Sequence, residues 1–483
     1  MSPASLTFLG HQSWLVEIGD TRVLVDPVLT DSFGHSDRLR FEIYPARQVA
    51  VEKMPSLDAV LVTNEHLDHF HLNSLDLLPP ETRILMPRMM PKVCVRALED
   101  AGRQVELVEL GAVRRIGAVD VVFVPGGPDA PMWENRVASV FVRHAEEKVG
   151  GVFIQSDTSI AVPSLEGGCD PDIVVATHNG QVPPAGHLGA FDNMLPVGSA
   201  DFAEVTGLRL LHGVLSDVVA NFPSVRYVTF SGGGYVQVPA KHGEFLWGDF
   251  EQLAGIASRL SLTTRVLGMS PGQTVVVGDG AEVRYCQAEW IDPAEPSRPV
   301  APSDKEAVAE PDLSEPLLPL FDEQLTGEDR ALVESELQLM APLLMQANLG
   351  RHLITQNTYL DKPVGPHRFA VHMRGFDAAG EADDGSRTFV LNFNNGRFEE
   401  QPLDLRDCLF SVPSGIDVNA VDLVAVLRGR IHIWELAVSR MRQWYLCDKF
   451  DSPVGFLYGY YSEQVRPELA AELYRNVRAL AWR

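Results

Sequence analysis

The chain has 483 residues, of which 45% are hydrophobic and 22% are charged, as in ordinary globular proteins. Acidic residues number 65 and basic residues 40, which gives a formal net charge of −25 at pH 7. This balance disfavours nucleic acid or an anionic membrane as the main partner, because both bind basic surfaces. The five cysteines are scattered without a CxxC pair, which argues against a disulfide framework or a zinc ribbon.

The chain starts without the basic segment and apolar run of a signal peptide. It also has no uncharged apolar stretch of about 18 residues, the length that a membrane-spanning helix needs. We therefore expect a cytoplasmic protein that acts on a small molecule.

The first part of the chain, 1–288, is predicted to be an α/β domain. Strands are expected at 6–9, 13–18 and 21–25, and the Gly-Asp pair between the last two is typical of a hairpin turn. A nearly all-apolar segment, 58–63, predicts a buried strand. Further helices are expected at 90–101, 199–213 and 247–260, and further strands at 104–110, 119–125, 137–143, 151–155, 173–177, 225–230, 273–277 and 281–285. This order favours an αββα sandwich, two facing sheets with helices outside, because no GxGxxG follows the first strand.

The rest of the chain is predicted to be a linker followed by a smaller domain. Residues 289–316 are rich in Pro, Ala, Glu, Asp and Ser, a composition typical of an extended linker. Residues 317–483 are expected to form an α+β domain. Its expected helices are 328–349, 433–444 and 467–481, and its expected strands are 369–374 and 388–393.

A cluster of metal-binding residue types follows the buried strand at 58–63. His66, Asp68 and His69 lie within four residues on the loop after that strand. Imidazole nitrogens and carboxylate oxygens bind borderline or hard divalent ions, and strand-end loops commonly carry active sites. The cluster therefore predicts a metal centre.

These residues resemble the HxHxDH signature of the metallo-β-lactamase superfamily. The opening FLGHQSWLVEIGDTRVLVDP, residues 8–27, resembles the UlaG-like branch of that superfamily. A third match is Asp157 after an apolar strand, where the family places a carboxylate of its metal site. The resemblance implies His66, Asp68, His69 and Asp157 as metal ligands. It implies a supporting role, without contact to the metal, for His11, Asp26 and Asn64.

The chain departs from the superfamily pattern at three positions. Asn64 stands where the first His of HxHxDH is expected. Pro125-Gly126-Gly127 and Ser231-Gly232-Gly233-Gly234 stand where two further His ligands are expected. A two-zinc site is therefore incomplete, and His178, after the strand at 173–177, is a candidate replacement ligand.

The same departures are similar to those of the CMP-N-acetylneuraminate hydroxylases, in the oxygenase region of that family. The matching segments are VRYVTFSGGGYV at 225–236, FAVHM at 369–373, and 421–436. This resemblance implies oxygen chemistry at a bound iron, which two histidines and a carboxylate suit. Those hydroxylases carry a Rieske domain that this chain does not show, so a separate ferredoxin or flavin reductase is expected.

Three functions remain open at this point. The first is an iron-dependent oxygenase or hydroxylase of a small polar metabolite. The second is a zinc- or manganese-dependent hydrolase of the UlaG-like type that acts on a phosphoester or a lactone. The third is a non-catalytic binding protein that kept the fold with a degenerate metal site.

Overall fold

The structure is a computed structural model of the chain, in which most residues of both parts are described. The described residues are 4–127, 136–147, 150–162, 168–178, 193–195, 207–232, 234–239, 250–259, 263–278, 283–297, 316–377, 385–446 and 451–481. The beginnings of the helices predicted at 199–213 and 247–260, and 298–315 of the predicted linker, lie outside these ranges. We call 4–297 the N-terminal region and 316–481 the C-terminal region.

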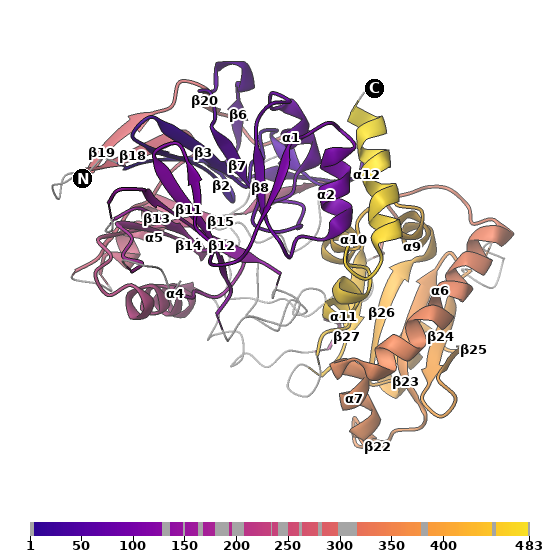
Figure 1. Ribbon diagram of the computed structural model, residues 1–483. Coiled ribbons are helices and arrows are strands. Elements are labelled where there is room, and N and C mark those ends of the chain that lie inside the picture. Colours follow the sequence, from indigo (N-terminus) through magenta and orange to yellow (C-terminus); the bar gives the residue numbers. More distant parts are fainter. Residues whose placement is uncertain are drawn as a thin grey trace.

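Two large sheets form the N-terminal region (Figure 1). Among the described residues, one has eight strands in the order β19-β18-β1-β2-β3-β7-β8-β9, and the other has seven in the order β10-β11-β12-β13-β14-β15-β17. The first sheet comprises β1 (Ala4–Gly10), β2 (Ser13–Ile18), β3 (Thr21–Val25), β7 (Ala59–Leu61), β8 (Ile84–Pro87), β9 (Val105–Val108), β18 (Gln273–Val277) and β19 (Val283–Gln287). The second comprises β10 (Arg114–Ile116), β11 (Val119–Pro125), β12 (Ala138–His144), β13 (Val152–Ile154), β14 (Ile173–His178), β15 (Tyr227–Gly232) and β17 (Arg265–Val266).

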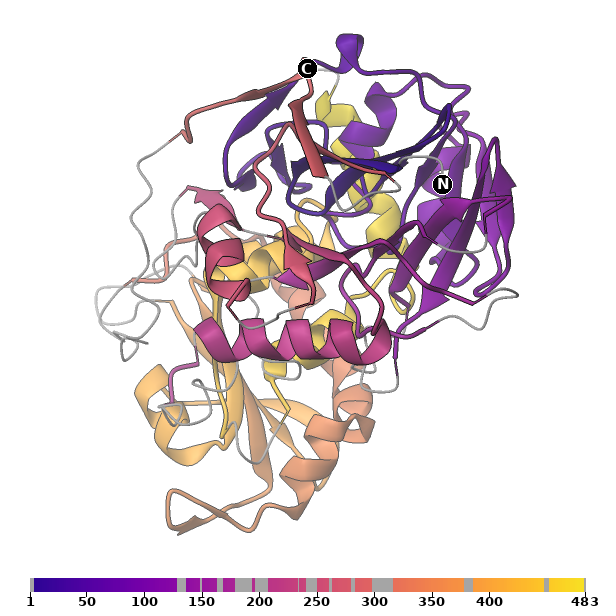
Figure 2. The ribbon, with the colours of Figure 1, turned by 90° about the vertical axis from the view of Figure 1, so that its left-hand side faces the viewer.

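The sheets face each other because alternate residues of their strands are apolar on the inner side. Trp14 and Val16 of β2 point into the core between the sheets, where they join Phe123 of β11 and Phe141 of β12. Leu15, between them, packs on the opposite side of its sheet, in a second cluster. Four described helices accompany the sheets: α1 (Leu72–Leu77), α2 (Lys92–Glu99), α4 (Gly207–Asn221) and α5 (Phe250–Ala257). Figure 2 shows α4 lying across the molecule near the C-terminal region.

Short elements connect the sandwich to the rest of the chain. A three-stranded sheet joins β16 (Tyr235–Val238), β5 (Arg40–Ile43) and β4 (Ser32–Phe33). The strand β20 (Ile291–Pro293), within the predicted linker, pairs with β6 (Arg47–Val49). A single 3-10 turn, Val51–Lys53, precedes β7.

The C-terminal region is built on a five-stranded mixed sheet in the order β25-β24-β23-β26-β27. Its strands are β23 (His367–Arg374), β24 (Arg387–Asn392), β25 (Arg397–Gln401), β26 (Ser414–Asn419) and β27 (Met441–Trp444), with the small pair β21 (Thr358–Tyr359) and β22 (Lys362–Pro363) beside it. Its described helices are α6 (Gly327–Gln346), α7 (Asn348–Thr355), α8 (Leu405–Ser411), α9 (Ala420–Leu427), α10 (Ile433–Arg440), α11 (Pro453–Tyr460) and α12 (Pro467–Ala481).

Each region contributes a segment that packs on the other. The last helix, α12, lies against α1 and α2 of the N-terminal region (Figure 1). Leu473 of α12 is buried in the same cluster as Leu15 and Leu75. In the other direction, Met194 packs with Trp444 on the C-terminal sheet. The sandwich and the C-terminal sheet are therefore joined by buried contacts from both sides.

Two predicted helices differ in the structure. The helix predicted at 433–444 ends at Arg440, and Met441–Trp444 form β27, because this segment pairs with β26 and its apolar residues enter the sheet core. The helix predicted at 328–349 is two helices, α6 and α7, since the backbone is extended at Ala347 between them.

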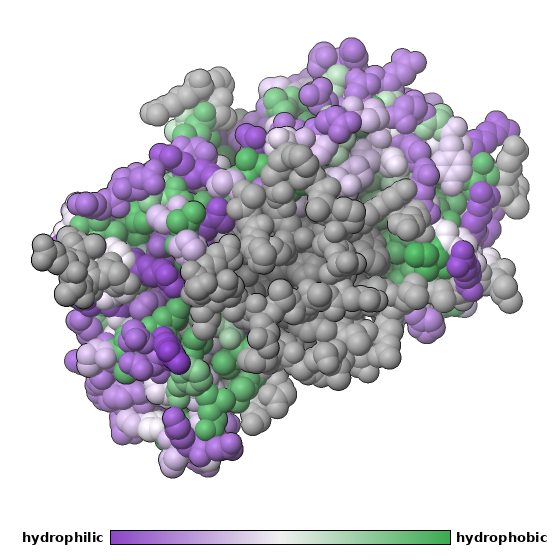
Figure 3. Space-filling view, turned by 180° about the vertical axis from the view of Figure 1, so that it is seen from behind, coloured by the Kyte–Doolittle hydropathy of each residue, from purple (hydrophilic) through white to green (hydrophobic). Residues whose placement is uncertain are grey.

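None of the helices in the described ranges is both long enough and apolar enough to cross a membrane. Figure 3 shows the face opposite to that of Figure 1, where hydrophobic patches on described residues lie among hydrophilic ones.

Candidate metal centre

Two loops, one from each sheet of the sandwich, form the site. His66, Asp68 and His69 lie on the loop after β7, and Asp157 follows β13 of the other sheet. The loops are joined by a hydrogen bond of 2.8 Å between the Thr63 and Ser156 hydroxyl oxygens. Because both loops follow the carboxyl ends of buried strands, the sandwich positions them against each other.

Three of the predicted ligands share one point. One donor atom from each of Asp68, His69 and Asp157 lies within 4.8 Å of the other two. The Nε2 atom of His69 is 3.0 Å from Oδ2 of Asp157 and 3.7 Å from Oδ2 of Asp68. The Nδ1 atom of His66 lies 3.5 Å from Oδ2 of Asp157, so that its ring borders these three residues. We call Asp68, His69 and Asp157 the donor trio.

His178 is described only by its backbone. It ends β14, where its backbone is in register with Gly232 of β15. Its side chain lies outside the part of the chain that the structure describes, so its role as a replacement ligand stays a prediction.

The three residues with a predicted supporting role all contact the ligand loop. Asp26 accepts a hydrogen bond of 2.7 Å from Nδ1 of His69, so that Nε2 of the same ring points to the two carboxylates. His11 places Nε2 2.8 Å from Oδ2 of Asp68. Asn64 accepts a hydrogen bond from the His66 backbone N–H with its Oδ1 atom, at 2.8 Å. These contacts restrain the Asp68 and His69 side chains and the loop backbone at His66.

Sequence reasoning missed further polar contacts. Gln12 donates from Nε2 to Oδ1 of Asp157 at 3.1 Å. Thr63 donates to both carboxylate oxygens of Asp26, from its backbone N–H at 2.8 Å and its hydroxyl at 2.7 Å. Gln12 follows His11 in the matched opening segment, and Thr63 directly precedes Asn64. Their position next to residues with a predicted supporting role is the sequence signal that could have identified them.

Three residues around the site have a left-handed backbone. The φ angles are 55° at His11, 43° at Asp26 and 58° at Ser156. This conformation costs about 1–3 kcal/mol for a residue with a side chain and is concentrated at functional sites. The surrounding contacts therefore hold the site in a conformation that the local backbone does not favour.

The charges at the site are unbalanced toward the negative. Burial disfavours a charged His69, but the carboxylates of Asp68, Asp157 and Asp26 outweigh it and hold the pKa of His69 well above its usual value. Burial alone would raise the pKa of Asp157, yet His69 and His66 keep it below its usual range. Two carboxylates thus compete for one Nε2 proton. Because buried negative charge is costly without a counter-charge, the donor trio fits a cation.

Glycines fill the positions where further histidines were expected. The Gly127 backbone N–H donates to the Ser159 carbonyl at 3.1 Å, and a Cβ atom there would lie 2.7 Å from the Ile160 carbonyl oxygen. The Gly232 backbone N–H donates to the carbonyl of His11 at 2.9 Å. Both glycines therefore support close backbone packing beside the loops that carry Asp157 and His11.

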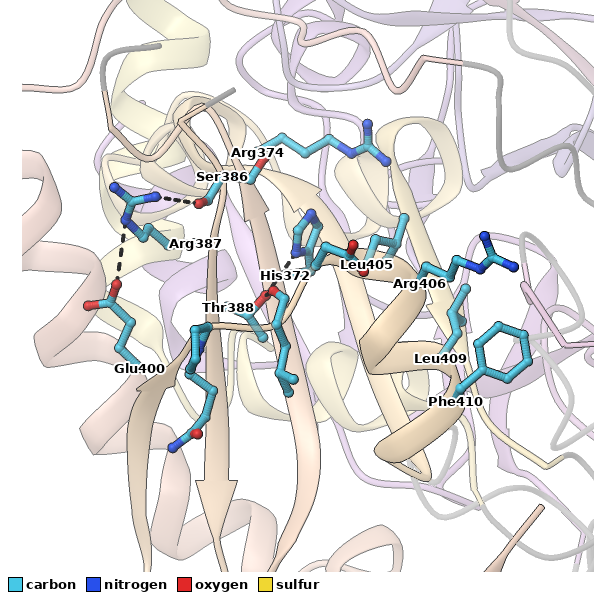
Figure 4. Close-up of a pocket in the computed structure, with 14 residues that line it drawn as sticks. His372, Arg374, Ser386, Arg387, Thr388, Glu400, Leu405, Arg406, Leu409 and Phe410 are labelled. Carbon is cyan, nitrogen blue, oxygen red and sulfur yellow. Dashed lines mark hydrogen bonds and ion pairs between the residues drawn. The ribbon is translucent and has the colours of Figure 1, made fainter. Parts of the chain in front are cut away.

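A separate cavity of about 1020 Å³ lies in the C-terminal region, between β23, β24 and α8 (Figure 4). His372 and Thr388 lie on its floor, joined by a hydrogen bond of 2.9 Å. Arg374 is paired with the buried Asp417 at 2.9 Å, and Arg387 reaches Glu400 at 3.4 Å. Two of the guanidinium groups around this cavity, those of Arg374 and Arg387, are thus paired with carboxylates.

The first part of the chain matches a known family. Residues 5–136 match the model described as the beta-lactamase superfamily domain. A metal-dependent hydrolase from Aeropyrum pernix is 24% identical over 279 residues, which covers 56% of this chain and 96% of that protein. An uncharacterized protein from Mycobacterium tuberculosis is 31% identical over 74 residues, 15% of this chain and 20% of that protein.

A comparison with solved structures also found similar chains. The isothiocyanate hydrolase from Delia radicum gut bacteria is 18% identical with a TM-score of 0.39, covering 56% of this chain and 98% of its own. CmlA, a diiron beta-hydroxylase from Streptomyces venezuelae, is 17% identical with a TM-score of 0.33, covering 48% of this chain and 45% of its own.

The family match and the two facing sheets agree. The chain has a mixed α/β structure whose N-terminal region has a metallo-β-lactamase-like fold, as the sequence predicted.

Proposed function

We propose that this protein is a metal-dependent hydrolase that acts on a phosphoester or a lactone, with the ion held by the donor trio and bordered by His66. The observation that supports this most is the approach of the Asp68 and Asp157 carboxylates to the same Nε2 atom of His69. The similarity to a metal-dependent hydrolase from Aeropyrum pernix favours hydrolysis over oxidation.

The residues of this chain would prepare the site as follows. Asp26 holds the proton of His69 on Nδ1, so that a metal displacing the Nε2 proton would meet the lone pair of that nitrogen. His11 and Gln12 restrain one carboxylate each, that of Asp68 and that of Asp157. A bound Zn²⁺ or Mn²⁺ supplies Lewis-acid chemistry and an activated water nucleophile.

Elemental mass spectrometry on protein purified without a chelator tests this proposal. We expect stoichiometric metal in the wild-type protein and its loss in the double variant His66→Ala with His69→Ala. His212→Ala is the matched control, because His212 is exposed on α4. Hydrolysis of model phosphoesters and lactones, without a reductant, should follow the metal content. Metal retained by the double variant would overturn the ligand assignment.

An iron-dependent oxygenase is the second candidate. The observation that favours it is the donor set itself, because imidazole and carboxylate ligands without a thiolate suit iron as well as zinc. This function predicts iron in the purified protein and O₂ consumption that depends on a separate ferredoxin or flavin reductase. A chelator that leaves the thermal midpoint unchanged, with no metal found, would instead favour a non-catalytic binding protein.

A further inference from the structure

We propose that Glu435, in the C-terminal region, is a positioning residue of the metal centre. It holds segment 33–36 of the N-terminal region, and that segment keeps His11 against Asp68. The inference rests on the proposed metal site, but not on which reaction the site performs.

The Glu435 carboxylate links the two regions at 0% exposure. Its Oε1 atom accepts the backbone N–H groups of His35 at 2.7 Å and Ser36 at 3.2 Å. Its Oε2 atom accepts the backbone N–H of His432 at 2.8 Å, at the start of α10. Because a buried carboxylate is stable only when its oxygens are hydrogen-bonded, these three bonds hold segment 33–36 against α10.

The segment approaches Glu435 too closely for a side chain between them. Gly34 has a φ of +121°, and a Cβ atom there would lie 2.9 Å from Oε1 of Glu435. Glycine is the residue that adopts this backbone without strain. The backbone of segment 33–36 is therefore shaped to meet the carboxylate.

Segment 33–36 reaches the metal centre through an aromatic ring. The ring of Phe33 stacks on the imidazole of His11, with centroids 5.1 Å apart and an interplanar angle of 26°. Trp434, beside Glu435 on α10, packs edge-on against Phe41 at 5.1 Å and also approaches Phe33 at 6.2 Å. Two consecutive residues of α10 thus support the ring that covers His11.

The contact to the donor trio completes the connection. His11 has a left-handed backbone, with φ at 55°, so that packing rather than local preference holds it in place. Its Nε2 atom is 2.8 Å from Oδ2 of Asp68. If segment 33–36 moves away from α10, Phe33 no longer holds the imidazole, and Asp68 loses its partner. Weaker metal binding should follow, although Glu435 does not touch the metal.

The zinc affinity of the full chain, measured by competition with a chromophoric chelator, tests this connection. Glu435→Gln keeps the side-chain shape but leaves one acceptor oxygen. We expect zinc to bind about 10–100-fold more weakly, the usual loss when a supporting partner of a metal ligand is removed. Asp422→Asn is the matched control. Asp422 is also 0% exposed and accepts backbone N–H groups, from Leu320 and Phe321, within the C-terminal region.

A double-mutant cycle separates positioning from general destabilisation. If Glu435 acts through His11, Glu435→Gln should weaken binding little further once His11→Asn is present. Phe33→Leu removes the ring but keeps an apolar side chain, and it should also weaken zinc binding. This variant replaces Glu435→Gln in the test if Glu435→Gln does not fold. Equal affinity for Glu435→Gln and Asp422→Asn, or additive effects with His11→Asn, would overturn the inference while leaving the metal site intact. A wild-type protein that binds no zinc would overturn the metal site itself.

Discussion

Replacing Asp26 by Asn tests how His69 presents its Nε2 atom. Asp26 is 1% exposed, and its carboxylate accepts from the Thr63 backbone N–H at 2.8 Å and from Nδ1 of His69 at 2.7 Å. An Asn side chain has one carbonyl oxygen, and that oxygen must face the Thr63 N–H, because an amide NH₂ there would meet another donor. The NH₂ group then faces Nδ1, so Nδ1 must accept and the proton moves to Nε2. Nε2, which faces Asp68 and Asp157, would then carry the one proton of a neutral ring, and a metal could not displace it and leave a neutral imidazole.

The expected loss of metal affinity and of stability follows from the hydrogen bonds that Asp26→Asn changes. Removing the partner that orients a metal-binding histidine weakens metal binding about 10–100-fold, which corresponds to about 1.4–2.7 kcal/mol. The free energy of unfolding of the metal-free protein should also fall by about 1.5–3 kcal/mol, because one hydrogen bond to a charged group is replaced. The backbone adds no further cost, because Asn tolerates the left-handed conformation found at Asp26.

Zinc competition with a chromophoric chelator measures the affinity, and thermal unfolding of the chelated protein measures the separate effect on stability. Asp58→Asn is the matched control, since the exposed Asp58 also accepts a backbone N–H, that of Arg22, at 2.8 Å. The control should bind zinc as the wild type does. Wild-type affinity in Asp26→Asn would refute the reasoning, because His69 would then present Nε2 without help from Asp26.

Three further predictions concern the ion, a glycine and pH. Adding a chelator to the purified protein should lower its thermal midpoint, and added metal should restore it. A ligand at about 100 times its Kd stabilises the folded state by about 2.7 kcal/mol. An unchanged midpoint would argue against a resident ion. Gly127→Ala should lower the free energy of unfolding by about 1–3 kcal/mol, and with it the thermal midpoint, because the added Cβ would lie 2.7 Å from the Ile160 carbonyl oxygen. Gly213→Ala, with open space on α4, should not lower the midpoint, and equal midpoints for the two variants would contradict this. Burial raises the pKa of Asp422 to about 7, above the value of about 3.9 in an unfolded chain, so the folded protein binds this proton more tightly and loses stability as the pH rises from about 4 to 7. Thermal midpoints of Asp422→Asn should fall less over this range than those of the wild type, and parallel curves would contradict the assignment.

Local patterns in the sequence predicted much of the first sheet and singled out Asp68 and His69, which lie together in the structure. The Gly19-Asp20 turn joins β2 and β3 as an antiparallel hairpin, as expected from the residues alone. The helix predicted at 433–444 was wrong over its last part, because Met441–Trp444 pair with β26. Apolar residues at helical spacing carry no information on a partner strand that lies far away in the chain.

The sequence by itself determined which residue types stand at the ends of the buried strands, since His66, Asp68 and His69 are neighbours on one loop. Only the tertiary structure decided that Asp157, 88 positions beyond His69, faces a nitrogen of His69 that also faces Asp68. It alone also placed Glu435 against His35, 400 positions apart in the chain. The physical reason is that chain neighbours share a loop through covalent geometry, whereas distant residues meet only where the packing of sheets and helices brings their backbones together.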